Sequence, residues 1–119
     1  MTPKETAGGR AQEDVAQFAT CWNEGRFFDA HETLEPRWIA TRDRGLRGLI
    51  QLAAAFHHLT RDNKKGARIT LERAILRLRD PHNAACQIDE SDMADFAENV
   101  LRRLDATPSE KLVASRPKI

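Results

Sequence analysis

The apolar side chains of this sequence recur every three or four residues, and no segment shows the two-residue alternation of a strand. Val15, Phe18, Ala19 and Trp22, for example, share one face of a helix. The chain has no Tyr, and the helix-favouring residues Ala, Leu, Glu and Arg are common. We therefore expect an all-α protein with no sheet. The predicted helices pass through residues 15–22, 27–38, about 46–61, 67–78 and 93–104.

Two parts of the chain repeat each other at a distance of 37 residues. Residues 30–35 (AHETLE) align with residues 67–72 (ARITLE), and each block follows a polar turn and a preceding helix. The repeat predicts a compact bundle of about five helices, built from two successive αα-hairpins plus a C-terminal helix. The period is close to that of tetratricopeptide repeats, but such solenoids need three or more units for stability, and only two are visible.

The length of 119 residues is typical of one domain, and 40% hydrophobic with 31% charged residues is an ordinary globular composition. We expect a disordered arm at 1–10, a single helical domain at 11–106 and a loosely ordered tail at 107–119. No apolar run is long enough to cross a membrane, and the first ten residues do not resemble a secretory signal. Two cysteines, Cys21 and Cys86, are too few for a disulfide framework, so we expect a cytoplasmic location.

The charge is unevenly distributed, although its net value is only +1. Residues 37–79 contain 11 Lys and Arg against 3 Asp and Glu, whereas both flanking parts are acidic. In one interpretation this basic segment forms a face that attracts phosphate groups. In the other, basic and acidic helix faces offset each other within the fold or across a homodimer. Because exposed aromatic residues are not interleaved with the basic ones, we expect no nucleic acid partner.

Several polar residues stand where the helical spacing points side chains toward the core. His31 lies on the apolar stripe of the second predicted helix, and Glu35 follows one turn later on the same side. On the third helix, Gln51 and His58 are seven residues apart on one face, with small alanines between them. If these two helices pack antiparallel, His31, Glu35 and His58 converge, with Gln51 near one end.

Two imidazoles and a carboxylate are enough for a three-ligand site that binds a divalent metal ion, with Zn²⁺ favoured over Mg²⁺ or Ca²⁺. In this interpretation His31, Glu35 and His58 are the ligands and Glu32 is a general base. Neighbouring side chains would support the ligands: Asp29, Trp38 and Gln51. The alternative is a buried hydrogen-bond network without metal, in which His31 and Glu35 form a charge-assisted pair. Both interpretations stay open.

Residues 23–38 (NEGRFFDAHETLEPRW) resemble the signature of domain of unknown function 309, a bacterial and archaeal family of small all-α proteins. Its hallmark, H-x-x-x-E-x-x-W, is here His31, Glu35 and Trp38. A second block of the family is similar to residues 48–59 (GLIQLAAAFHHL). The family motif has been proposed to bind metal, and some members are labelled predicted metal-dependent hydrolases. The resemblance therefore implies a metal site at the motif residues.

The sequence departs from the family pattern at two positions. Asp62 stands where a Gly usually precedes Asn63, and Asp29 replaces the commoner Glu. The first change affects a helix end, and the second keeps a carboxylate. Neither change removes a candidate ligand.

Two classes of function follow from these observations. The first is a metal-dependent enzyme, hydrolytic in mechanism, which requires the His31 cluster to open to a cleft. The second is a non-enzymatic, tetratricopeptide-like helical module that binds a peptide, protein or phosphorylated partner through residues 37–79. In this second class the His31 cluster is sealed in the core as a structural network.

Overall fold

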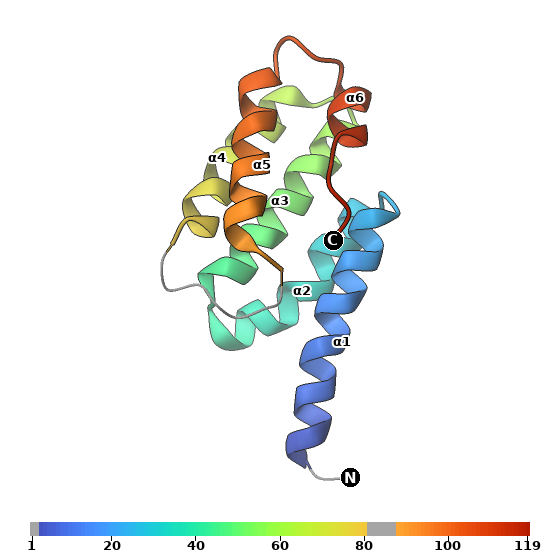
Figure 1. Ribbon diagram of the computed structural model, residues 1–119, viewed down its shortest axis with the longest axis vertical. Coiled ribbons are helices and arrows are strands. Elements are labelled where there is room, and N and C mark those ends of the chain that lie inside the picture. Colours follow the sequence, from blue (N-terminus) through green and yellow to red (C-terminus); the bar gives the residue numbers. More distant parts are fainter. Residues whose placement is uncertain (1–2, 81–87) are drawn as a thin grey trace.

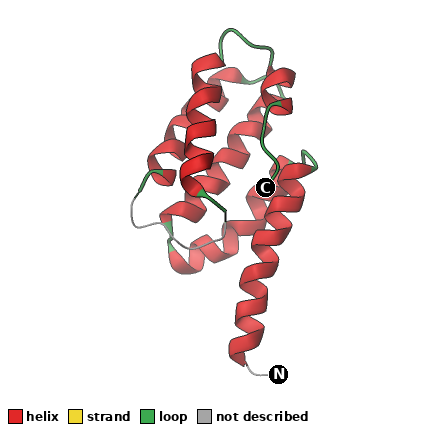
Figure 2. Cartoon of the chain, viewed as in Figure 1, coloured by secondary structure: helices red, strands yellow, loops and turns green. Residues whose placement is uncertain are grey.

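The chain folds into a bundle of helices, and the residues that the structure describes contain no strand. The structure, a computed structural model, describes residues 3–80 and 88–119, with side chains from Glu13 onward. The predicted all-α bundle of about five helices is confirmed, with one further short helix at the C-terminal end. In Figures 1 and 2 the central helix is α3, which contacts α2, α4, α5 and α6. The helices are α1 (Pro3–Asn23), α2 (Phe27–Thr41), α3 (Arg44–Thr60), α4 (Lys64–Leu78), α5 (Glu90–Arg103) and α6 (Ser109–Ala114).

Short polar side chains fix where three of these helices begin. Asp43, Asn63 and Asp89 each accept a hydrogen bond from the backbone N–H three residues later, at the first turns of α3, α4 and α5. Arg42 ends α2 in the left-handed conformation, with φ of 58°, and Asp43 follows it directly as the cap of α3. Because only these two residues join α2 to α3, the two helices form a tight αα-hairpin.

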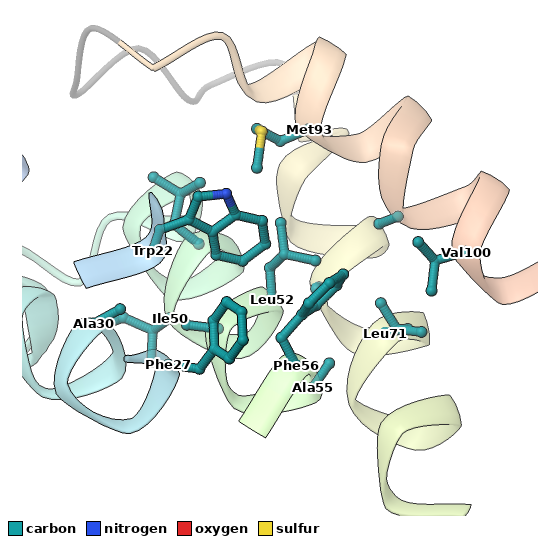
Figure 3. Close-up of a cluster of buried hydrophobic side chains, with 14 of the residues drawn as sticks. Trp22, Phe27, Ala30, Ile50, Leu52, Ala55, Phe56, Leu71, Met93 and Val100 are labelled. Atoms are coloured by element: carbon teal, nitrogen blue, oxygen red, sulfur yellow. The ribbon is translucent and has the colours of Figure 1, made fainter. Parts of the chain in front are cut away.

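Aromatic rings from the first three helices form the centre of the core (Figure 3). The ring centroid of Trp22 lies 4.9 Å from that of Phe56 and 5.4 Å from that of Phe27. All three rings are buried, and aliphatic side chains such as Leu71 on α4 and Val100 on α5 pack beside them. Rings at these separations pack with specific geometry as well as buried area. They therefore fix α2 relative to α3, the two helices that carry the candidate site residues.

The helices α3 and α4 approach each other closely at Gly48. A Cβ atom on Gly48 would lie 2.8 Å from Cγ of Leu78 and 3.1 Å from its backbone N, so a larger residue does not fit without movement. This approach places the beginning of α3 beside the end of α4. Because α2 leads directly into α3, the ends of three helices meet in this region (Figure 1).

The C-terminal residues contact the end of α1. Nε1 of Trp22 donates a 2.9 Å hydrogen bond to the carbonyl of Pro117, and the Asn23 amide bonds both backbone groups of Ile119. Residues 107–119, expected to be a loosely ordered tail, thus include α6 and these long-range contacts. At the other end, α1 begins at Pro3, within the range expected to be a disordered arm.

Two further findings concern the length of the helices and the cysteines. None of the described helices is long and apolar enough to span a membrane. Cys21 is a buried free thiol, and Cys86 lies outside the described residues.

Candidate functional site

Three histidines line a small cavity between α2 and α3, which we call the imidazole pocket. It has a volume of about 130 Å³ and is walled by Phe28, His31, Ala54, His57 and His58. The three histidines are half-buried, so the pocket opens at the surface and is not sealed in the core. The structure thus brings His31 and His58 to one cavity, as the facing helix stripes suggest.

His31 and Glu35 face each other across one turn of α2. Nδ1 of His31 lies 3.8 Å from Oε2 of Glu35, which is too far for a hydrogen bond. The Nδ1 atom is nevertheless buried, and it has no hydrogen-bond partner in the described part of the chain. A buried polar atom left unpaired costs about 1–3 kcal/mol. A ligand or a side-chain rotation that satisfies Nδ1 would recover part of this free energy.

His57 also lines the pocket, although the helical spacing does not predict it as a site residue. The ring of Phe28 contacts both His57 and His31, with centroid separations of 5.5 and 6.1 Å. Burial lowers the pKa of His57 below its ordinary value, and the positive charge of Arg61 lowers it further. The lowered pKa keeps His57 neutral over a wider pH range. The only signal in the sequence was its place next to His58.

His58 is tied to the cap of α4. Oδ1 of Asn63 accepts a 3.0 Å hydrogen bond from the N–H of Gly66, which orients the amide so that Nδ2 donates to Nδ1 of His58 at 3.2 Å. With Nδ1 accepting, the neutral ring carries its proton on Nε2. In this arrangement neither ring nitrogen of His58 has a lone pair available for a metal ion.

The other predicted site residues do not line the imidazole pocket. Gln51 is buried on α3, and its Oε1 has no partner among the residues described. Glu32 is exposed, and so is Asp29, whose carboxylate lies 3.5 Å from the guanidinium of Arg26. Trp38 packs against the core two turns after His31 and contacts arginines instead of histidines.

The residues present do not form a ready-made metal site. No group of three His, Cys, Asp or Glu side chains within residues 13–80 and 88–119 is placed to hold a metal ion. His31 and Glu35 offer donor atoms on one turn of α2, whereas His58 is engaged with Asn63. A zinc ion held by three protein ligands would therefore require side chains to rotate.

Arginines gather where α2 ends, α3 begins and α4 ends. The guanidinium carbons of Arg42 and Arg47 lie 4.6 and 4.2 Å from the ring centroid of Trp38, which is the geometry of cation–π contacts. On α4, burial lowers the pKa of Arg77, and the positive charges of nearby arginines on α3 and α4 lower it further. Gly48 and Leu78, the chain neighbours of Arg47 and Arg77, approach each other directly, so the two helices bring these arginines to one region. We define the arginine face as Arg42, Arg47, Arg73 and Arg77.

Most other arginines of the basic segment make ion pairs within the chain. The pairs are Arg37–Asp14, Arg44–Asp80, Arg68–Asp105 and Arg79–Asp95, each at 2.6 Å. By contrast, Arg42, Arg47 and Arg73 form no ion pair with a carboxylate of the described residues. The offset between basic and acidic faces is thus incomplete, because Arg42, Arg47 and Arg73 keep positive charges that no carboxylate of the described residues pairs with.

Residues 15–70 match the model of a family described as domain of unknown function (DUF309). This segment of the chain is a DUF309 domain. The DUF309 domain includes the imidazole pocket and Trp38, whereas Arg73 and Arg77 follow it along α4. The resemblance to this family, expected from the sequence, is therefore confirmed. Comparisons with curated proteins and with solved structures gave no match.

Proposed function

We propose that this protein is a helical module that binds an acidic partner through the arginine face. One observation carries the proposal: Arg42 and Arg47 are held over Trp38 without a carboxylate partner among the described residues. A guanidinium group binds carboxylate or phosphate through its planar fork of donors. Contacts with the indole ring restrict the two side chains before the partner arrives, which lowers the entropy lost on binding.

The distribution of charge supports a compact acidic ligand. The arginine face is concentrated where Gly48 lets α3 and α4 approach, while the whole chain has a net charge of only +1. Elsewhere the surface carries both signs of charge, for example Asp92 and Glu110 among the exposed acidic residues and Lys65 and Lys111 among the exposed basic ones. A short acidic segment, or one stretch of a longer acidic chain, can contact this face without meeting those carboxylates.

Retention on immobilised poly-L-glutamate tests this function. The double variant Arg47→Ala/Arg73→Ala should elute at clearly lower salt than the wild type, because two unpaired guanidinium groups are lost. The matched control is Arg61→Ala/Arg102→Ala, which removes the same charge from two exposed arginines outside the face. The control should elute close to the wild type. Equal losses in both variants would show that net charge alone, and not the arginine face, binds the acidic polymer.

A divalent-metal site at the imidazole pocket is a second candidate function. It is supported by the buried Nδ1 atom of His31, which lacks a hydrogen-bond partner and faces Glu35. The pocket is also partly open, as an enzyme requires, whereas a purely structural network would be sealed. We propose His31 and Glu35 as ligands, with His58 as the third ligand after it releases Asn63. In a hydrolase, exposed Glu32 would be the base.

Isothermal titration with Zn²⁺, Mn²⁺ and Mg²⁺ tests the metal hypothesis. We expect Zn²⁺ to bind most tightly, because two imidazoles favour borderline ions over hard ones. Affinity should fall as the solution is made more acidic, since protonated imidazole does not coordinate. His58→Ala should weaken binding, while the control Glu32→Ala should leave metal affinity unchanged. Equal weak binding by wild type and His58→Ala would contradict the proposed ligand set.

A further inference from the structure

Two large apolar side chains stand exposed on the same face of α4 as Arg73. Ile69 is 46% exposed and Leu76 is 74% exposed. With Arg73 between them, the three residues occupy positions i, i+4 and i+7, which share one side of a helix. Single exposed apolar residues are ordinary, but these two lie on either side of Arg73, a member of the arginine face.

The spacing of these groups indicates the chemistry of the ligand. Along α4, the Cα atoms of Ile69 and Leu76 are separated by about 10.5 Å, since a helix rises 1.5 Å per residue. A second helix with apolar side chains seven residues apart presents them at the same interval. Acidic residues beside that apolar pair would lie opposite Arg73. The face thus combines apolar anchors with charges, as a surface for an amphipathic acidic helix requires.

A phosphate backbone matches this surface less well. Phosphate groups would satisfy the arginines but provide nothing to cover Leu76. Trp38, the ring closest to the arginines, packs against the core and already contacts two guanidinium groups, so it is not an open platform for a base. The sequence pI of about 7.9 is also below the range typical of nucleic-acid-binding domains.

We infer that the partner of the arginine face is an amphipathic acidic helix of another protein. Its apolar residues cover Ile69 and Leu76, and its carboxylates pair with Arg47 and Arg73. This inference rests on the proposed function and specifies the partner that the module binds. It differs from binding by charge alone because it requires the apolar contact.

A selection from a peptide library tests the inference. The probe is a displayed library of 21-residue helical peptides, with positions randomised among Ala, Leu, Glu, Lys and Gln and selected on the full chain. Enriched peptides should carry Leu at i and i+7 together with a net negative charge. Binding of one enriched peptide, labelled with fluorescein, is then measured by anisotropy with the wild type and variants.

Three variants on α4 separate the contributions. Leu76→Ala and Arg73→Ala should each weaken peptide binding about tenfold, as expected for the loss of one buried apolar or charged contact. The control Glu72→Ala removes an exposed carboxylate from the same helix and should leave binding unchanged or tighten it. Circular dichroism confirms that all three variants are folded. A loss of affinity in Glu72→Ala equal to that in Leu76→Ala would overturn the inference.

The remaining outcomes distinguish the inference from the function on which it rests. Two outcomes would contradict the inferred amphipathic helix but leave the proposed function intact. In the first, the enriched peptides are acidic but lack the Leu spacing. In the second, no peptide is enriched although the protein is retained on poly-L-glutamate. If a 20-base-pair DNA duplex binds the wild type more tightly than the peptide and loses affinity in Arg73→Ala, the partner is a nucleic acid. If poly-L-glutamate retention is unaffected by Arg47→Ala/Arg73→Ala, both proposals fail.

Discussion

The hydroxyl of Ser109 donates a 2.7 Å hydrogen bond to Oδ1 of Asp62, which joins the last helix to the turn between α3 and α4. Asp62 has a left-handed backbone, with φ of 53°, a conformation that Gly adopts without strain. Asp tolerates this conformation better than most residues, though less well than Gly. The side-chain bond to nearly buried Ser109 offsets part of that backbone cost.

Asp62→Ala should lower the free energy of unfolding by about 1–3 kcal/mol, because it leaves the Ser109 hydroxyl unpaired and puts Ala in a left-handed conformation. Asp62→Gly loses the same bond but relieves the backbone, so it should be about 1 kcal/mol more stable than Asp62→Ala. Urea denaturation gives both values. A double-mutant cycle with Ser109→Ala isolates the hydrogen bond, and a coupling energy of zero would contradict this explanation.

Arg116 should be a major contributor to the docking of the tail. Its guanidinium group donates to the carbonyls of Trp22 and Asn23 at 2.9 and 2.8 Å and lies 5.2 Å from the ring centroid of Phe27. Arg116→Ala should therefore lower the free energy of unfolding by about 2 kcal/mol, as hydrogen bonds from a charged group are strong. Lys118, two residues later and exposed, is the control. Comparable thermal stability of Arg116→Ala and Lys118→Ala would show that the tail contributes little.

The short helix α6 illustrates what the apolar spacing does not reveal. A helix of six residues is less than two turns long, so it contains too few apolar positions to display a 3.6-residue period. The residues after it are held by hydrogen bonds to backbone carbonyls, such as that of Pro117, which leave no pattern in the sequence. The five longer helices were predictable because each carries a full apolar stripe.

The candidate site was predictable in part for a similar reason. The spacing of His31, Glu35 and His58 placed them on facing stripes, and the structure has His31 and His58 at one pocket. The spacing did not reveal the hydrogen bond between Asn63 and His58, because that bond depends on the geometry of a helix cap. Trp38 was expected to support a metal site, but its contacts are with arginines, which follow from the tight turn between α2 and α3.

Gly48→Ala should lower the free energy of unfolding by about 1–3 kcal/mol, because the added methyl overlaps Leu78 on α4. The contact at 3.1 Å is with backbone, so rotation of the Leu78 side chain alone does not relieve it. Leu78→Ala should cost about 2–5 kcal/mol in the wild type and less in the Gly48→Ala background, where the smaller side chain gives room. Strictly additive losses in chemical denaturation would show that the two positions do not touch.

His57 should make stability depend on pH. Burial first, and then the positive charge of Arg61, lower its pKa in the folded state, so between that pKa and about 6.5 the unfolded chain binds more protons. Stability should therefore rise with pH across this window and be fully present above it. The drop in unfolding free energy from pH 7.5 to 5.5 should be smaller in His57→Gln than in the wild type.

The pKa of His57 itself is measurable by NMR titration of its ring protons. It should lie below 6.5 in the wild type and rise in Arg61→Ala, because one like charge is removed. The rise should be incomplete, since burial is the larger cause and remains in that variant. The control Arg102→Ala lies on α5 and should leave the pKa of His57 unchanged. Two results would contradict this explanation: a wild-type pKa at or above 6.5, or a full return of the pKa to its ordinary value in Arg61→Ala. Either result would mean that burial in the imidazole pocket has little effect on the pKa of His57.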